Sequence, residues 1–125
     1  MILGIGADMV EIPRVTRMIE LYGERFAQRI LGPSEWDGYR ASAHRDRYLA
    51  SRFAAKEAFG KAYGTGLRAP VLLTYISVNH DALGRPLLEL APPLQALSDS
   101  RGIRVHHITL THERSLACAV VVLES

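Results

Sequence analysis

The pattern of apolar and polar positions changes period along the chain. Residues 2–10 form an apolar run interrupted by glycines, which is typical of a buried strand. Between residues 13 and 64 the pattern is helical, and beyond residue 70 it changes to runs in which apolar and polar positions alternate. The chain is therefore expected to begin with a strand, continue as helices and end in a strand-rich half.

Glycine and proline divide the helical part into three expected helices. The strongest of them is the last, which is rich in alanine and ends where Gly64 can adopt a left-handed conformation. The first begins at Pro13, whose ring suits the first helical turn, and Gly23 is the position where this helix can break. The three helices are expected over residues 13–31, 34–41 and 47–64.

The second half is expected to form two hairpins with a short helix between them. The segment DALGRP supplies glycine and proline for the first turn, and HERS forms the second. Pro92 and Pro93 start the intervening helix, which is expected to end near Gly102. The expected strands cover residues 74–80, 86–91, 103–112 and 116–124. This order predicts an α+β fold of one domain, residues 1–125, in which a long helix and shorter helices pack against a mostly antiparallel sheet.

Composition narrows the function classes. No apolar run approaches the length of a membrane span, and the first residues lack the features of a signal peptide, so we expect no membrane association and a cytoplasmic location. A single cysteine, Cys118, gives no indication of disulfides. Eight arginines within residues 1–52 form either a solvated surface or a basic face for an acidic partner. They are not interleaved with aromatic residues expected to be exposed and do not form a known nucleic-acid motif, so no nucleic acid partner is expected.

Two carboxylates lie in segments that are otherwise apolar or rich in alanine. Asp8 interrupts the first strand, and Glu57 lies in the long helix. A buried carboxylate is costly unless a positive group meets it. If the strand packs beside the helix, the two carboxylates could share Mg²⁺, which keeps water ligands and accepts phosphate oxygens. Lys56, Lys61 and Arg52 would then supply positive charge for a pyrophosphate nearby.

The same helix also allows a simpler interpretation. Glu57 and Lys61 are four residues apart and could form an ordinary surface ion pair, worth a few tenths of a kcal/mol. Gly60 weakens that interpretation, because an exposed glycine within a helix costs roughly 1 kcal/mol relative to alanine. Among the histidines, which lack the spacing of a zinc site, His112 at a strand end is best placed to reach a ligand. The chain has no nucleophile-elbow serine and no complete dinucleotide-binding fingerprint.

Two long motifs carry a family resemblance. GIGADMVEIPRV and RFAAKEAFGKAYGTG resemble the two signature motifs of holo-(acyl carrier protein) synthases, the small bacterial type of 4′-phosphopantetheinyl transferase. The resemblance covers essentially the whole chain and includes RFAQRIL, the LGRP turn and the terminal THERSLACAVVVLE hairpin. It implies transfer of the 4′-phosphopantetheine arm of coenzyme A to a serine of apo acyl carrier protein, leaving adenosine 3′,5′-bisphosphate. It also implies a role in fatty acid biosynthesis.

The resemblance implies roles for individual residues. Asp8 and Glu57 match the family's magnesium ligands, and Lys61 matches the lysine that contacts the phosphates. These three are the expected catalytic residues, and either Glu57 or a metal-held water accepts the proton of the carrier serine. The other positions matched to coenzyme A contacts are Arg52, Gly64, Thr65, Gly66 and His112.

The resemblance also implies partners. The family is trimeric with active sites between subunits, so a homotrimer is expected. Acyl carrier proteins are small and acidic, and the positions matched to the family's basic and apolar docking surface are Arg14, Arg17, Met18, Arg25 and Phe26. Met18 and Phe26 can equally be core residues. Two alternative functions are a non-catalytic oligomeric module that binds an acidic protein and a magnesium-dependent nucleotide phosphohydrolase, in which water replaces the serine.

Overall fold

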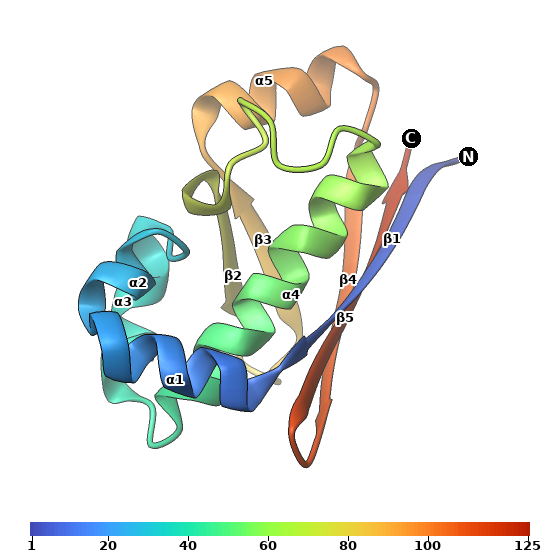
Figure 1. Cartoon of the computed structure of the whole chain (residues 1–125). Coiled ribbons are helices and arrows are strands. Elements are labelled where there is room, and N and C mark those ends of the chain that lie inside the picture. The colour runs from blue at the N-terminus through green and yellow to red at the C-terminus, as the bar shows by residue number, and fades with distance from the viewer.

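A three-stranded antiparallel sheet and a long helix form the centre of the molecule (Figure 1). In the computed structural model, which describes residues 1–125, β5 (Leu116–Glu124) lies between β1 (Ile2–Glu11) and β4 (Val105–Glu113). The long helix α4 (Arg45–Tyr63) covers one face of this sheet and packs mainly on β1 and β5. The first strand of the chain therefore lies directly beside the longest helix.

The remaining elements lie near the start of α4, beside its middle and near its end (Figure 1). Near the start of α4 the chain forms two short helices and one longer helix. After α4 it forms a separate two-stranded antiparallel hairpin, which is followed by a further helix near the end of α4. These elements are α1 (Ile12–Tyr22), α2 (Glu24–Gln28), α3 (Trp36–Ala41), β2 (Ile76–His80), β3 (Pro86–Leu90) and α5 (Pro92–Ser100). Two single turns of 3₁₀ helix complete the fold, η1 (Pro33–Glu35) and η2 (Leu73–Tyr75).

Two glycines allow the backbone of β1 to lie against the backbone of α4. A Cβ atom at Gly4 would overlap the carbonyl oxygen of Ala62, and one at Gly6 would overlap the carbonyl oxygen of Ala58. Alternate residues of a strand share a face, so Asp8 follows these glycines on the side that faces the helix. The close contact thus places Asp8 against α4.

Apolar side chains pack on both sides of α4 and bury most of its length. One cluster joins α4 to β5, β2 and α5, with Phe59 and Leu94 fully buried in it. The other joins the first half of α4 to α1 and to the segment after α2, with Leu49 and Ile30 at its centre. Because burial of apolar surface is the main favourable term in folding, these two clusters hold the helix in place.

The expected α+β fold is confirmed, with differences at the ends of elements. Gly23, at φ 58° and ψ −140°, separates α1 from α2, so the helix expected over residues 13–31 is broken there. Gly64 ends α4 in the left-handed conformation, as expected. The strand expected over 74–80 begins at Ile76, because the residues before it form η2. The strands form two antiparallel sheets, since β3 packs beside β4 without pairing to it.

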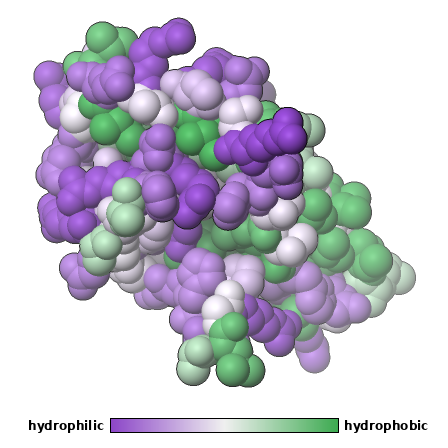
Figure 2. All heavy atoms as spheres, turned by 90° about the horizontal axis from the view of Figure 1, so that it is seen from below, coloured by the Kyte–Doolittle hydropathy of each residue, from purple (hydrophilic) through white to green (hydrophobic).

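The face of the three-stranded sheet opposite α4 carries no helix. Several large apolar side chains on it are exposed, with Ile5 at 68% and Met9 at 62% of full accessibility. Figure 2 shows hydrophobic residues gathered on the side where the sheet lies, whereas much of the rest of this view is hydrophilic. An apolar surface of this kind is typical of an interaction face. None of the helices combines the length and the apolar character that crossing a bilayer requires.

Replacing Gly6 by alanine should destabilise the fold, because the new methyl group would overlap the carbonyl oxygen of Ala58. Backbone atoms cannot move aside as a flexible side chain can, so we expect the free energy of unfolding to fall by about 3 kcal/mol or more. Urea denaturation followed by circular dichroism measures this loss. Ala82→Ser, at an exposed position of the turn between β2 and β3, is the control and should change the free energy by less than about 0.5 kcal/mol. Unchanged stability of Gly6→Ala would show that the close contact is unnecessary.

Candidate active site

Asp8 and Glu57 line one cavity between β1, α1 and α4. The cavity has a volume of about 470 Å³ and combines the two carboxylates with arginine and apolar side chains. No group of three or more histidine, cysteine, aspartate or glutamate side chains is placed to hold a metal ion, so the two carboxylates form the acidic part of the site by themselves. The other lining residues are Met9, Val10, Arg14, Val15, Arg17, Met18, Phe26 and Phe53.

Lys61 pairs with Asp8 rather than with Glu57. Its ammonium nitrogen lies 3.0 Å from Oδ1 of Asp8 and also donates to the carbonyl oxygen of Ala7 at 3.2 Å. The ordinary pair between Glu57 and Lys61, which the spacing allowed, is therefore absent. Lys61 is 55% exposed and remains open to the surroundings of the cavity.

Glu57 carries the uncompensated charge of the site. Burial raises the pKa of its carboxyl group above the ordinary value, the negative charge of Asp8 raises it further, and Lys61 offsets only part of this. Two carboxylates that disfavour one another beside an open cavity are a suitable donor set for Mg²⁺, because this ion binds through one or two carboxylates and retains waters or phosphate oxygens. The residues present therefore fit a magnesium ion.

The side chains expected to dock a carrier protein border the same cavity. Arg14, Arg17, Met18 and Phe26 line it from the side of α1 and α2. Arg25 lies with Met18 and Phe26 along an adjoining cavity of about 280 Å³. Met18 and Phe26 are half-buried rather than enclosed in the core. The structure thus brings all five expected residues together on one face beside Asp8 and Glu57.

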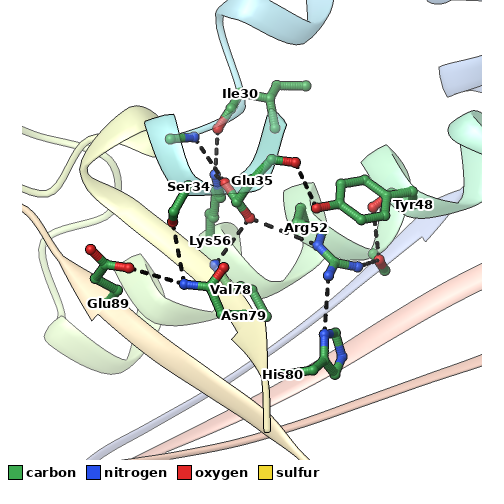
Figure 3. Close-up of polar contacts among 12 residues, drawn as sticks. Ile30, Ser34, Glu35, Tyr48, Arg52, Lys56, Val78, Asn79, His80 and Glu89 are labelled. Atoms are coloured by element: carbon green, nitrogen blue, oxygen red, sulfur yellow. Dashed lines mark hydrogen bonds and ion pairs between the residues drawn. The ribbon is translucent and has the colours of Figure 1, made fainter. Parts of the chain in front are cut away.

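Lys56 does not belong to this site, and the expectation that it supplies charge for a pyrophosphate is wrong. Its side chain is fully buried, and its ammonium group donates to Oε1 of Glu35 at 2.5 Å and to the carbonyl oxygen of Ile30 (Figure 3). The reason is helical geometry, since neighbouring residues of a helix point about 100° apart. With Glu57 facing the cavity, Lys56 faces the interior.

Arg52 also lies away from the two carboxylates. Its guanidinium carbon lies 3.7 Å from the centre of the Tyr48 ring, and Nη2 lies 3.4 Å from Nδ1 of His80 (Figure 3). Its Nε lies 3.8 Å from Oε2 of Glu35. A contact between Arg52 and coenzyme A stays a prediction. Sequence patterns gave no indication of Glu35, whose role depends entirely on these tertiary contacts.

The loop Gly64-Thr65-Gly66 follows directly on the end of α4. Both glycines have positive φ angles, 78° and 64°, which side chains with a Cβ rarely adopt. The N–H of Gly66 donates to the carbonyl oxygen of Gly60 at 3.1 Å, and a Cβ at Gly60 would crowd Gly66. The glycine within the helix therefore leaves room for the close approach of the chain's own loop. Thr65 is exposed at the tip, so it can meet a ligand from outside.

His112 is not part of the cavity within one chain. It is exposed near the end of β4, opposite Ala117 of β5, which in turn pairs with Val10 of β1. His112 is thus separated from β1 by two strand spacings, a distance of about 10 Å. Its contact with coenzyme A stays a prediction.

Comparisons with known proteins agree with this geometry. Residues 4–121 match the model of the 4′-phosphopantetheinyl transferase superfamily. The holo-(acyl carrier protein) synthase of Nitrosospira multiformis is 52% identical over 124 residues, which cover 99% of each chain. The crystal structure of the Neisseria meningitidis holo-(acyl carrier protein) synthase matches with a TM-score of 0.97 and 41% identity over 100% of both chains. The Helicobacter pylori synthase in complex with coenzyme A matches with a TM-score of 0.84 and 28% identity, over 96% of this chain and 99% of that one.

Replacing Glu57 by glutamine should stabilise the metal-free protein near neutral pH. The change removes a partly buried charge beside Asp8 and keeps the shape of the side chain, so we expect the melting temperature to rise by roughly 2 °C. A carboxyl whose pKa is raised by folding binds its proton more tightly in the folded chain. The wild type should therefore lose stability as pH rises from the ordinary pKa through the raised one, and the variant should not.

Thermal unfolding in EDTA across the acidic to neutral range measures both effects. Glu20→Gln, which changes an exposed carboxylate of α1, is the matched control and should leave the pH dependence unchanged. A variant Glu57→Gln that melts below the wild type near neutral pH would show that the carboxylate of Glu57 has a stabilising partner.

Proposed function

The chain belongs to the holo-(acyl carrier protein) synthases of the 4′-phosphopantetheinyl transferase superfamily, and we propose how its residues perform the reaction of that family. The enzyme transfers phosphopantetheine from coenzyme A to apo acyl carrier protein. We place the transfer in the cavity of Asp8 and Glu57 and assign it to one domain, residues 1–125. The observation that carries this placement is that two carboxylates, distant in sequence, meet beside a basic face. We further propose that the enzyme serves fatty acid biosynthesis.

Asp8 and Glu57 are the residues that would hold Mg²⁺. Both line the cavity, and the raised pKa of Glu57 reflects a charge that a cation would compensate. When bound, the ion would offset the negative charge that builds on the pyrophosphate oxygens during phosphoryl transfer. Since Lys61 already compensates Asp8, Glu57 is the ligand whose charge depends most on the metal.

Lys61 is the proposed contact to the phosphates. Its ammonium group donates to Asp8 and to the carbonyl oxygen of Ala7 and is half exposed, so its third N–H is left to meet a ligand. A positive group held in advance where charge develops lowers the barrier without reorganisation at the moment of reaction. We propose that the loop Gly64-Thr65-Gly66 and Arg52 contact the nucleotide part of coenzyme A.

Glu57 is also the proposed acceptor of the serine proton. The carrier serine attacks the β-phosphorus of coenzyme A, its hydroxyl proton leaves, and adenosine 3′,5′-bisphosphate departs. Glu57 lines the cavity beside the proposed docking surface, so it can take this proton directly or through a water that the metal would hold.

The face made by Arg14, Arg17, Met18, Arg25 and Phe26 is the proposed docking surface for the carrier. It combines exposed positive charge with two half-buried apolar side chains at the edge of the cavity. Charges of this kind raise the rate of association with an acidic partner, while apolar anchors contribute affinity. A carrier helix on this face would hold its serine beside Glu57.

We propose that the exposed apolar face of the sheet is covered by other copies of the chain in a homotrimer. Ile5, Met9 and Val120 would be buried there, which removes apolar surface from water. Active sites between subunits also give His112 a role, because it is exposed at the end of a hairpin and has no partner in its own chain. There it would contact coenzyme A in the site of a neighbouring subunit.

One mixture tests the proposed function: the protein, coenzyme A, Mg²⁺ and an apo acyl carrier protein. We expect the intact mass of the carrier to rise by one phosphopantetheine, and EDTA to prevent the change. Hydrolysis of coenzyme A with an unmodified carrier would identify a phosphohydrolase instead. Binding of the carrier with neither reaction would identify a non-catalytic module.

Asp8→Ala in the same mixture tests the metal ligands. Loss of a carboxylate from the site should slow transfer by about 100- to 1,000-fold while the circular dichroism spectrum is unchanged. Asp37→Ala, at an exposed carboxylate of α3, is the control and should transfer at the wild-type rate. A wild-type rate for Asp8→Ala would contradict the assignment of the metal site.

Arg14→Glu tests the docking surface. Reversal of an exposed charge beside the cavity should raise the KM for the carrier by about 10-fold, with the KM for coenzyme A changed by less than about 2-fold. Steady-state kinetics with each substrate varied in turn measures both constants. Arg104→Glu, an exposed arginine before β4, is the matched control for net charge. Equal effects of Arg14→Glu on both constants would exclude Arg14 from the docking surface.

A further inference from the structure

Three charged side chains are buried beside α4 and outside the cavity. Lys56 is 0%, Glu35 1% and Arg52 7% exposed, and none of them lines the cavity of Asp8 and Glu57. Burial lowers the pKa of Lys56 to about 8 in spite of the opposing effect of Glu35. Buried ion pairs often contribute no more stability than apolar residues of similar volume, so stability alone does not account for the cluster.

Glu35 joins three parts of the fold through one carboxylate (Figure 3). Its Oε1 accepts from the N–H of Gly32 at 2.9 Å and from Nζ of Lys56 at 2.5 Å. Its Oε2 accepts from the N–H of Val78 at 3.0 Å. The turn after α2, the strand β2 and the helix α4 are therefore tied to a single side chain.

The contacts of α4 with this cluster determine how the helix is rotated. Tyr48, Arg52 and Lys56 are four residues apart and lie along one side of α4 (Figure 3). The hydroxyl of Tyr48 donates to the carbonyl oxygen of Glu35 at 2.8 Å, and Arg52 stacks on the Tyr48 ring. Glu57 is the residue after Lys56 and points about 100° around the helix from it. A rotation of the helix would therefore move the carboxylate of Glu57 away from Asp8.

The same cluster meets the segment that carries the docking surface. Lys56 donates to the carbonyl oxygen of Ile30, which lies two residues beyond the end of α2. Arg25 and Phe26 lie within α2. One hydrogen bond thus connects the segment proposed to contact the carrier with the residue next to Glu57.

We propose that Glu35 and Lys56 are positioning residues for the transfer. They hold α4 at the rotation that presents Glu57 to the cavity. They also fix α2, which carries Arg25 and Phe26 of the docking surface, relative to α4. The inference rests on the proposed function, because it assigns to Glu57 and to the docking surface the roles given above. A cluster that only balanced buried charge would contribute to folding and leave the turnover of folded protein unchanged.

A double substitution separates positioning from charge balance. Lys56→Met and Glu35→Gln should each lower both the melting temperature and kcat, because each leaves a buried group without its partner. The double variant Glu35→Gln/Lys56→Met removes both charges at similar volume. We expect its melting temperature to return toward that of the wild type, with kcat still at least about 10-fold lower, the effect of a misplaced catalytic group. The KM for coenzyme A should change by less than about 2-fold.

Tyr63→Phe is the matched control on the same helix. It removes the hydrogen bond between the Tyr63 hydroxyl and Nε2 of His106, 2.9 Å long, at the far end of α4. We expect a lower melting temperature and an unchanged kcat. If kcat of the double variant recovered together with its melting temperature, or if Tyr63→Phe lowered kcat equally, the positioning role would be wrong.

Tyr48→Phe provides the test if the double variant does not fold. It keeps the ring that stacks on Arg52 and removes only the hydrogen bond to Glu35, so we expect kcat to fall by about 3-fold without loss of folded protein. An unchanged kcat would contradict the proposal. Wild-type protein in the same assay distinguishes failure of the positioning role from failure of the proposed function. If the wild type transferred no phosphopantetheine, the proposed function itself would be contradicted.

Discussion

The contact between the backbones of β1 and α4 determines where every proposed catalytic group lies. Gly4 and Gly6 leave no side chain between the strand and the carbonyl oxygens of α4, so the two elements approach more closely than ordinary side chains allow. Asp8 continues the same face of the strand, and Lys61 reaches it from the helix. Because the contact involves main-chain atoms, it has little freedom to adjust. The distance between the proposed metal ligands is thus a consequence of how the core is packed.

The helix α4 meets a different environment on each side. Its alanines pack on the sheet, Glu57 faces the cavity, and Lys56 faces Glu35 in the interior. A helix enclosed in this way has no broad solvent-exposed face, which explains why its sequence mixes alanine with charged residues rather than dividing them into two stripes. Rotation of this one element would disturb the core, the site and the buried cluster together. The fold therefore couples its stability to the geometry of the site.

The sequence contained the principal elements of the site but not the direction of every side chain. Asp8 and Glu57 could be paired from the sequence, because glycines beside a carboxylate in an apolar segment indicate close approach of another segment. The expected role of Lys56 is wrong because its position next to Glu57 in the sequence does not give the direction of its side chain. Neighbouring residues of a helix point about 100° apart, and Lys56 points into the interior. Glu35 gave no signal, since a glutamate in a short polar segment is ordinarily exposed. Its burial depends on the N–H of Val78, more than forty residues away in the chain.

The two groups of charges differ in how completely they are compensated. Glu35 meets an ammonium, a guanidinium and two backbone N–H groups, so its charge is satisfied within the chain. Glu57 has no hydrogen-bonded partner of this kind, and its pKa is raised, first by burial and then by the nearby charge of Asp8, with Lys61 offsetting only part of the effect. An interior carboxylate that is fully compensated holds structure, whereas one left uncompensated beside a cavity retains affinity for a cation or a proton. This difference, more than residue type, separates the two glutamates into a positioning group and a catalytic one.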